Sequence, residues 1–174
     1  MKKNEPKFGL VVFKNTDNIG DDVQSYAAKQ FLPHIDYIID REEIDSFVSN
    51  DKETVNCIMN GWWLSNRSCF PPSPYINPLP VSMHLRNTEF NGPTYLKGLA
   101  MDWLKKHEPI GLRDDLVKKY LDEAGVVNYF SGCMTLTIPK EENIKKENYI
   151  CVVDLDEKIV DTIKKHTDLK VVEV

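Results

Sequence analysis

Hydrophobic and polar positions alternate in blocks along the chain, and this pattern predicts short strands separated by helices. Apolar runs bounded by polar residues predict strands over Lys7–Phe13, Asp36–Asp40, Val55–Asn60, Val81–Arg86, Pro109–Leu112 and Val126–Phe130. Apolar residues at helical spacing predict helices over Gly20–Leu32, Thr94–Lys106 and Arg113–Ala124. Strands that alternate with helices are typical of an α/β protein, here a Rossmann-like parallel sheet flanked by helices on both faces.

Two stretches interrupt this alternation. Ser65–Pro80 contains five prolines, so we expect a functional or mobile loop that cannot be a central strand or a helix. The charged stretch Lys140–Asn148 precedes a last strand–helix–strand pattern over Tyr149–Asp154, Glu157–His166 and Leu169–Val174. We therefore predict a Rossmann-like domain over residues 1–145. Residues 146–174 then form one βαβ unit, which either begins an incomplete second domain or docks on the first sheet.

Composition and charge narrow the class of protein. The chain has 174 residues, of which 41% are hydrophobic and 28% charged, as in ordinary globular proteins. Its net charge of −5, with no basic cluster, argues against a nucleic-acid partner. No apolar run approaches the roughly 20 residues of a membrane span, and no signal peptide is recognisable, so we expect a cytoplasmic protein.

The cysteines and histidines give no metal-binding pattern. The four cysteines form no C-x-x-C pair and the four histidines are scattered, so no metal site is expected. Cys57 and Cys151 lie in apolar runs, where we expect buried, reduced thiols.

The turn between the first strand and the first helix is the first candidate site, with Asn18, Gly20, Asp21 and Gln24 as substrate-binding residues. In open α/β sheets such a turn lies at the rim where ligands bind. Acidic residues at a helix N-terminus repel phosphate, so a neutral, hydroxylated ligand suits this turn better than an anion. The alternative is that Asp21 or Asp22 only caps the helix.

The end of the third strand is the second candidate site. Asn60 offers an amide, Gly61 allows close backbone approach, and Trp62 offers a face on which a sugar ring can stack. We expect the neighbouring Trp63 in the core, whereas Trp62 is left open between ligand contact and core burial.

His84 lies in the strand Val81–Arg86. Strict alternation would place Val81, Met83 and Leu85 on one face and Ser82, His84 and Arg86 on the other. An imidazole near the ligand-facing end of a strand can transfer protons, and the alternative is a structural histidine.

Arg113 follows the fifth strand, where a guanidinium can hold a carboxylate or phosphate bidentately. Its alternative role is an ion pair with Asp114 or Asp115. Ser131 and Gly132 follow the sixth strand, and their hydroxyl and backbone N–H groups can line a polar pocket. Cys133 next to them has no histidine close in sequence to act as a base, so a structural thiol accounts for it.

The amino-acid sequences of these segments, and their order along the chain, resemble those of the polysaccharide pyruvyl transferase family over nearly the whole chain. The resemblance depends on Asn18–Gln24 (NIGDDVQ), on Asn60–Trp62 (NGW), on a proline-rich segment followed by Ser82–His84 (SMH), on Gly111–Asp114 (GLRD) and on Ser131–Thr137 (SGCMTLT). The GLRD and SGCMTLT segments, in that order, are the most specific.

The resemblance implies a two-domain, glycosyltransferase-B-like architecture, of which this chain resembles the N-terminal half. It also implies transfer of pyruvyl from phosphoenolpyruvate to sugar hydroxyls of a surface or exopolysaccharide glycan, without a metal or other cofactor. Arg113 corresponds to an arginine that contacts the anionic donor, and together with His84 it is our candidate for the catalytic groups.

Family members are nearly twice this length, and their second half supplies a histidine that is the proposed acid. His166 does not match that histidine. We therefore expect the chain to hold half of the cleft and to need a complementing chain or a homo-oligomer, which leaves open whether it is an enzyme alone. Two alternatives remain. One is a non-catalytic remnant or assembly subunit that binds a glycan or an anionic metabolite, and the other is half of a nucleotide-sugar glycosyltransferase.

Overall fold

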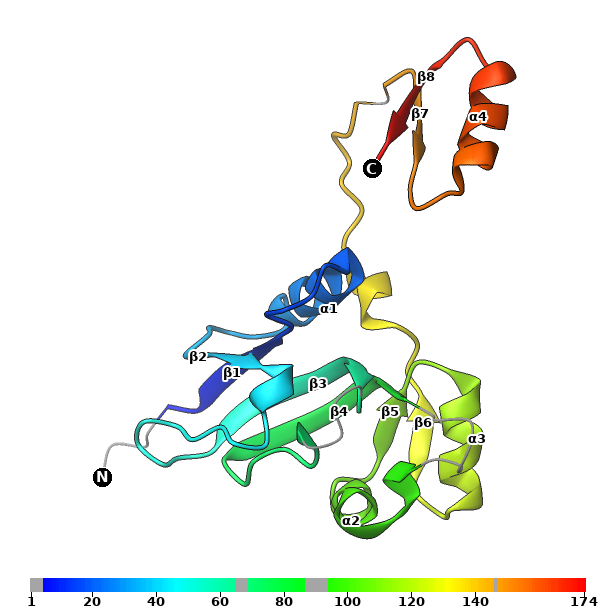
Figure 1. The fold of residues 1–174 in the computed structure, drawn as a ribbon. Helices are drawn as coiled ribbons and strands as arrows, with labels where there is room; N and C mark the ends of the chain where they lie inside the picture. The colour runs from blue at the N-terminus through cyan, green and yellow to red at the C-terminus, as the bar shows by residue number, and fades with distance from the viewer. Residues whose placement is uncertain (1–4, 65–68, 87–93, 146) are drawn as a thin grey trace. The chain divides into compact units, whose positions relative to one another are not determined.

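A computed structural model describes residues 5–64, 69–86, 94–145 and 147–174, and Figure 1 shows its elements. The chain divides into two compact units, Met1–Ile138 and Pro139–Val174. The larger unit contains every candidate site residue.

The larger unit is built on one six-stranded sheet, with strand order β2-β1-β3-β4-β5-β6. Every neighbouring pair is parallel. The strands are β1 (Lys7–Val12), β2 (Tyr37–Asp40), β3 (Val55–Trp63), β4 (Ile76–Leu85), β5 (Ile110–Leu112) and β6 (Asn128–Phe130). This arrangement confirms the predicted α/β, Rossmann-like fold.

Helices cover both faces of this sheet (Figure 1). The helices are α1 (Ile19–Lys29), α2 (Gly98–Lys106) and α3 (Asp115–Glu123), with short 3₁₀ turns at η1 (Arg41–Glu43), η3 (Thr94–Leu96) and η4 (Met134–Thr137). Ala27 and Ala28 of α1 pack with Leu10 and Ile58 on one face. The larger core, on the other face, joins the sheet to α2 and α3 and includes Trp63, Met83, Trp103, Leu112 and Leu121.

The prediction that Ser65–Pro80 contains no central strand is wrong for its last five residues, and residues 65–68 lie outside the described part. β4 begins at Ile76 and includes Pro78 and Pro80, although it lies between β3 and β5. The reason is the short contact with β5, which pairs with β4 only at Met83. The proline-containing half therefore has a partner on one side only, like an edge strand, where a missing N–H is tolerated.

The predicted alternation along Val81–Arg86 is also wrong at its start. From Met59 to Gly61 β3 advances two residues while β4 advances three, from Pro80 to Met83, so β4 contains a bulge. Ser82 within it has a φ of 59°. Because an extra residue reverses the alternation, Val81 packs on the α1 side whereas Met83 and Leu85 lie in the opposite core.

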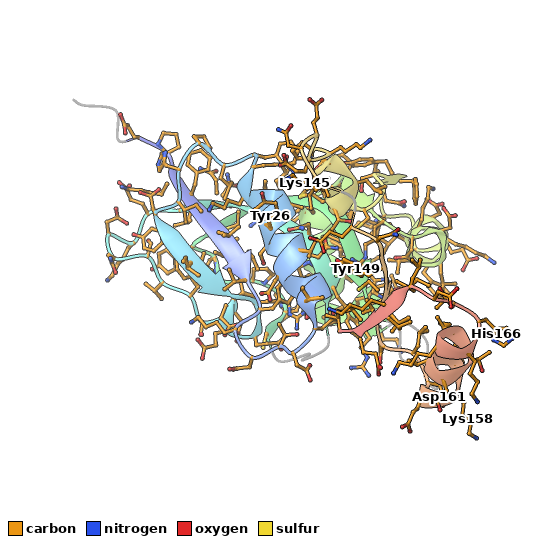
Figure 2. The ribbon with its side chains drawn as sticks, turned by 90° about the horizontal axis from the view of Figure 1, so that it is seen from above. Tyr26, Lys145, Tyr149, Lys158, Asp161 and His166 are labelled. Atoms are coloured by element: carbon orange, nitrogen blue, oxygen red, sulfur yellow. The ribbon has the colours of Figure 1, made fainter. Side chains whose placement is uncertain are left out.

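The smaller unit consists of β7 (Tyr149–Val152), α4 (Glu157–Lys165) and β8 (Lys170–Glu173), with the two strands parallel. Val152 and Val160 are buried between strand and helix. Figure 2 shows Lys158, Asp161 and His166 projecting outward from α4, and all three are exposed. Cys151 is exposed, so its predicted burial is wrong: alternation along a two-stranded sheet with one packed helix turns every second residue to solvent. Cys57, in β3, is buried as predicted.

Candidate functional site

The predicted site residues come together at one edge of the six-stranded sheet, where its parallel strands end. We call it the carboxyl edge. The register places Trp62 of β3 beside His84 of β4, and Met83 beside Leu112 of β5. The residues at this edge follow β1 (Asn18, Gly20, Asp21, Gln24), end β3 (Asn60, Gly61, Trp62), lie in β4 (His84), or follow β5 (Arg113) and β6 (Ser131, Gly132).

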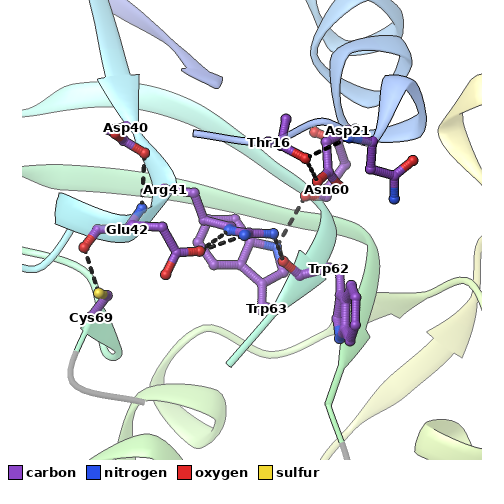
Figure 3. A network of polar contacts seen from close by, with 10 residues as sticks. Thr16, Asp21, Asp40, Arg41, Glu42, Asn60, Trp62, Trp63 and Cys69 are labelled. Carbon is purple, nitrogen blue, oxygen red and sulfur yellow. Dashed lines mark hydrogen bonds and ion pairs between the residues drawn. The ribbon is translucent and has the colours of Figure 1, made fainter. Parts of the chain in front are cut away.

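The start of α1 is capped by Asn18, whose side chain accepts a hydrogen bond from the Gly20 N–H at 2.9 Å. Asp21 accepts a bond from the Thr16 hydroxyl at 2.9 Å (Figure 3), and Asp22 is exposed. Neither aspartate is therefore the cap residue, contrary to the alternative considered from the sequence. Both place negative charge in the first turn, which satisfies the helix dipole from within the protein.

Gln24 and Asn60 are buried, with exposed fractions of 7% and 4%. The Asn60 amide donates to the backbone oxygen of Gln24 at 2.9 Å and to its side-chain oxygen at 3.1 Å. The Gln24 amide in turn donates to Cys133 Sγ at 3.2 Å. These three residues, the amide cluster, join α1, β3 and the segment after β6.

Gly61 passes close beneath α1. Its φ is 81°, and a Cβ at this position would lie 3.3 Å from the Phe13 ring and 3.5 Å from Gln24 Cγ. A glycine is required here both by the left-handed backbone and by the close approach. The structural reason for this residue is therefore the passage of β3 under the amide cluster.

The two tryptophans that end β3 differ in environment. Trp63 is 1% exposed, as predicted, and its indole N–H donates to the Asn60 carbonyl at 3.0 Å. Trp62 is half-buried, and its ring lies 5.7 Å from the guanidinium of the exposed Arg86. Arg41 donates to the Trp62 carbonyl at 2.7 Å and also pairs with Glu42 (Figure 3). Trp62 is thus held through its backbone and keeps part of its side chain accessible.

His84 forms a close pair with Asp114. Its Nδ1 lies 2.7 Å from Asp114 Oδ2, and its side chain is 32% exposed. The Trp62 ring meets it edge-on, with centroids 6.1 Å apart. Asp114 also caps α3, since its Oδ1 accepts from the Val117 N–H at 2.9 Å.

Arg113 lies immediately after β5, where its backbone N–H donates to the Met83 carbonyl at 3.0 Å. Its side chain is half-buried, and no carboxylate of the described residues lies within ion-pair distance of it. The alternative of an ion pair with Asp114 or Asp115 is therefore wrong, because Asp114 binds His84 and the α3 N-terminus instead.

Ser131 and Gly132 are tied to the bulge of β4. The Ser131 hydroxyl donates to the Leu112 carbonyl at 3.0 Å and accepts from the Ser82 N–H at 3.0 Å. The Ser82 hydroxyl donates to the Gly132 carbonyl at 2.8 Å and accepts from the Met134 N–H at 2.6 Å. These bonds fix the turn after β6, and they occupy the Ser131 hydroxyl within the protein.

The Cys133 thiol lies in the segment after β6 and contacts Gln24 of α1. Its burial opposes ionisation, but hydrogen bonds with Thr135 and Gln24 and the positive charge of Arg113 outweigh this and lower the pKa of Cys133. By contrast, burial raises the pKa of the Cys57 thiol to about 12. The contacts of Cys133 thus favour its thiolate, whereas those of Cys57 favour its thiol.

Sequence reasoning missed two residues that organise this site. Asp114 was considered as a partner of Arg113 and as a helix-starting residue but not as a partner of His84, and Ser82 was considered only as a polar neighbour of His84. An aspartate that follows an arginine at a helix start is a recognisable cap signal, but nothing local indicates that its second oxygen reaches another strand. The bulge that turns Ser82 inward has no signal in the sequence pattern.

The described residues contain neither a metal-binding cluster nor a membrane-spanning helix. In residues 5–64, 69–86, 94–145 and 147–174, no group of three or more His, Cys, Asp or Glu side chains is arranged to hold a metal ion. None of the helices in those ranges is long and apolar enough to cross a membrane.

The fold and the carboxyl edge together define a Rossmann-like α/β protein whose strand ends carry a histidine and an arginine, the latter with no ion pair among the described residues. The chain belongs to the polysaccharide pyruvyl transferase family: the sequence model of that family matches residues 18–174, as the resemblance of its motifs indicated. No curated protein and no solved structure matches the chain.

Proposed function

We propose that the carboxyl edge binds phosphoenolpyruvate and takes part in transfer of its pyruvyl group to hydroxyls of a glycan. The observation that carries the proposal is Arg113, a half-buried guanidinium with no ion pair among the described residues. A cation that is partly removed from water and unpaired costs free energy, and a bidentate anionic ligand offsets that cost. Membership of the polysaccharide pyruvyl transferase family supports this donor and a glycan acceptor.

A comparison of two arginines supports an external anion at this position. Arg41 pairs with Glu42 and donates to the Trp62 carbonyl, so the protein satisfies it internally. Arg113, on the other side of Trp62 in the sheet, has its backbone N–H bonded to the Met83 carbonyl, but its side chain has no such partner in the described residues. The chemistry that matches its guanidinium is a carboxylate or phosphate group.

The reaction places defined demands on the site. Addition of a hydroxyl to the central enol carbon needs anion stabilisation at the donor and proton transfer at the acceptor. Arg113 supplies the first. Trp62, a half-buried residue whose indole nitrogen is buried, supplies an apolar surface on which the acceptor ring can pack.

Calorimetric titration of phosphoenolpyruvate into the chain tests the donor assignment. We expect Arg113→Ala to weaken binding by roughly 10- to 100-fold, the value of one charged hydrogen-bonding group. Lys119→Ala is the matched control, because it removes one exposed positive charge from α3 without touching the edge. Equal affinity of wild type and Arg113→Ala, or no binding by wild type, would contradict the proposal. Binding of inorganic phosphate as tightly as phosphoenolpyruvate would indicate a general anion site instead.

A further inference from the structure

The carboxylate of Asp114 is shared between a helix and an imidazole. Its Oδ1 accepts from the Val117 N–H at 2.9 Å, and its Oδ2 lies 2.7 Å from His84 Nδ1. A carboxylate only accepts hydrogen bonds, so Nδ1 must be the protonated nitrogen of the neutral ring. The lone pair is then on Nε2, and the cap bond keeps the carboxylate from rotating away.

The pair lies beside the proposed donor clamp. The Arg113 N–H donates to the Met83 carbonyl at 3.0 Å, which holds the residues after β5 against the end of β4. The His84 side chain keeps 32% of its surface exposed, with Trp62 at its edge. With Nδ1 occupied by Asp114, Nε2 is the nitrogen that remains for a ligand.

We propose that His84 is the base that accepts the proton of the acceptor hydroxyl through Nε2, and that Asp114 is its positioning residue. The assignment rests on the proposed function. In the addition step, the hydroxyl oxygen bonds to C2 of the enol and its proton passes to Nε2. The C2=C3 electron pair moves to C3, which takes up a proton from solvent, and the imidazolium then releases its proton to solvent so that the ring is neutral again. When a second hydroxyl bonds to C2, phosphate leaves with the C2–O electron pair and that hydroxyl's proton.

The chain offers a matched pair of variants for this proposal. Asn is as good a helix cap as Asp, so Asp114→Asn keeps α3 while it replaces the carboxylate facing Nδ1 by an amide. Asp115→Asn removes the same charge from the next, exposed position of the first turn. If Asp114 acted only by stabilising α3 or by its negative charge, Asp114→Asn and Asp115→Asn would have the same effect.

Nitrogen-detected NMR of the histidine rings tests the positioning without any reaction. At a pH of about 8.5, where an ordinary histidine is neutral, we expect His84 in the Nδ1–H form in wild type and in Asp115→Asn. Asp114→Asn is expected to shift the ring at least twofold toward the Nε2–H form. The signal is assigned by its loss in His84→Gln. An Nε2–H ring in wild type, or an unchanged ring in Asp114→Asn, would overturn the positioning role.

Turnover tests the base. With phosphoenolpyruvate and a panel of methyl hexopyranosides as acceptor probes, phosphate release by Asp114→Asn and His84→Gln should fall at least 10-fold in kcat. The KM for phosphoenolpyruvate should stay within about twofold, because the donor binds at Arg113. Unchanged kcat in either variant would overturn the base assignment while leaving the donor site intact. Absence of turnover in wild type would overturn the base assignment for this chain alone, and the proposed function falls only if phosphoenolpyruvate binding is absent as well.

Discussion

The carboxyl edge of the sheet has two sides that use their polar groups differently. At the α1–β3 side, Gln24 and Asn60 are buried and bind each other and Cys133. At the β4–β5 side, about a third of the His84 side-chain surface is exposed to solvent, and Arg113 has no carboxylate partner among the described residues. We predicted ligand binding at both sides for the same reason, namely that polar residues lie where parallel strands end.

The difference shows that a polar residue at a ligand-facing edge has two possible uses. Amides with both donor and acceptor groups can satisfy one another, and the amide cluster does so across three segments. A guanidinium has donors only, so it needs an anion that the protein or a ligand must provide. We therefore expect the α1–β3 side to respond to substitution in stability and the β4–β5 side to respond in binding.

Loss of the Asn60 amide should have the largest effect on stability. Asn60→Ala leaves the buried side-chain oxygen of Gln24 without its donor and removes a second bond to the Gln24 backbone oxygen, and we expect a loss of about 3 kcal/mol. Urea unfolding followed by circular dichroism measures it. Asn77→Ala, at an exposed amide of β4, is the control and should change stability by less than about 0.5 kcal/mol. A similar small value for Asn60→Ala would contradict the structural role of the cluster.

Gly61→Ala should cost about 2 kcal/mol, from a left-handed backbone and from contact with Phe13 and Gln24. Gly98→Ala separates these causes, because Gly98 also has a positive φ, 56°, but nothing lies within 4 Å of its added Cβ. The difference between the two variants in the same unfolding assay measures the close approach. Equal losses would mean that β3 does not pass tightly under α1.

The two arginines should differ by about 1–2 kcal/mol in their effect on stability. Arg41→Ala removes the bond to the Trp62 carbonyl and the contact with the Phe13 ring, whereas Arg113→Ala removes no bond among the described residues. We expect the free energy of unfolding of Arg113→Ala to lie within about 0.5 kcal/mol of the wild-type value. A large loss for Arg113→Ala would move Arg113 to the structural side of the comparison.

The smallest expected effect is a difference in thiol reactivity. Alkylation requires the thiolate, so a lowered pKa means that Cys133 reacts at a lower pH than an ordinary cysteine. Cys57, whose burial raises its pKa to about 12, should stay unmodified across the neutral range. Peptide mass mapping after brief iodoacetamide treatment between about pH 6 and pH 9 measures both. Gln24→Leu removes one donor to Cys133 and should move its reaction to higher pH.

Local patterns predicted the fold because most of the strands and helices described in the larger unit carry their own periodicity. The two errors within β4 come from long-range causes. Pro78 and Pro80 are tolerated because β5 is short, and the reversal at Val81 comes from a bulge opposite Met59 and Gly61. A single strand's sequence contains neither its neighbour's length nor its register.

The sequence predicted where the candidate site residues lie in the fold, but not which partners most of them contact. The rule that parallel strands present ligands at their carboxyl ends located Asn60, His84 and Arg113 correctly at one edge. The pairing of His84 with Asp114 was not predictable, because it joins residues 30 positions apart on different elements. Ser82 and Cys133 likewise gain their partners only through folding.

The shared carboxylate of Asp114 restricts which residues selection can accept at this position. Asn, Ser and Thr can cap α3 but offer no carboxylate to Nδ1, and Glu is a poor cap with a longer side chain. Aspartate meets both demands, so replacement of Asp114 by any of these residues loses either the cap of α3 or the contact with His84 Nδ1. We therefore expect that Asp114 is substituted in related sequences only where His84 is substituted as well.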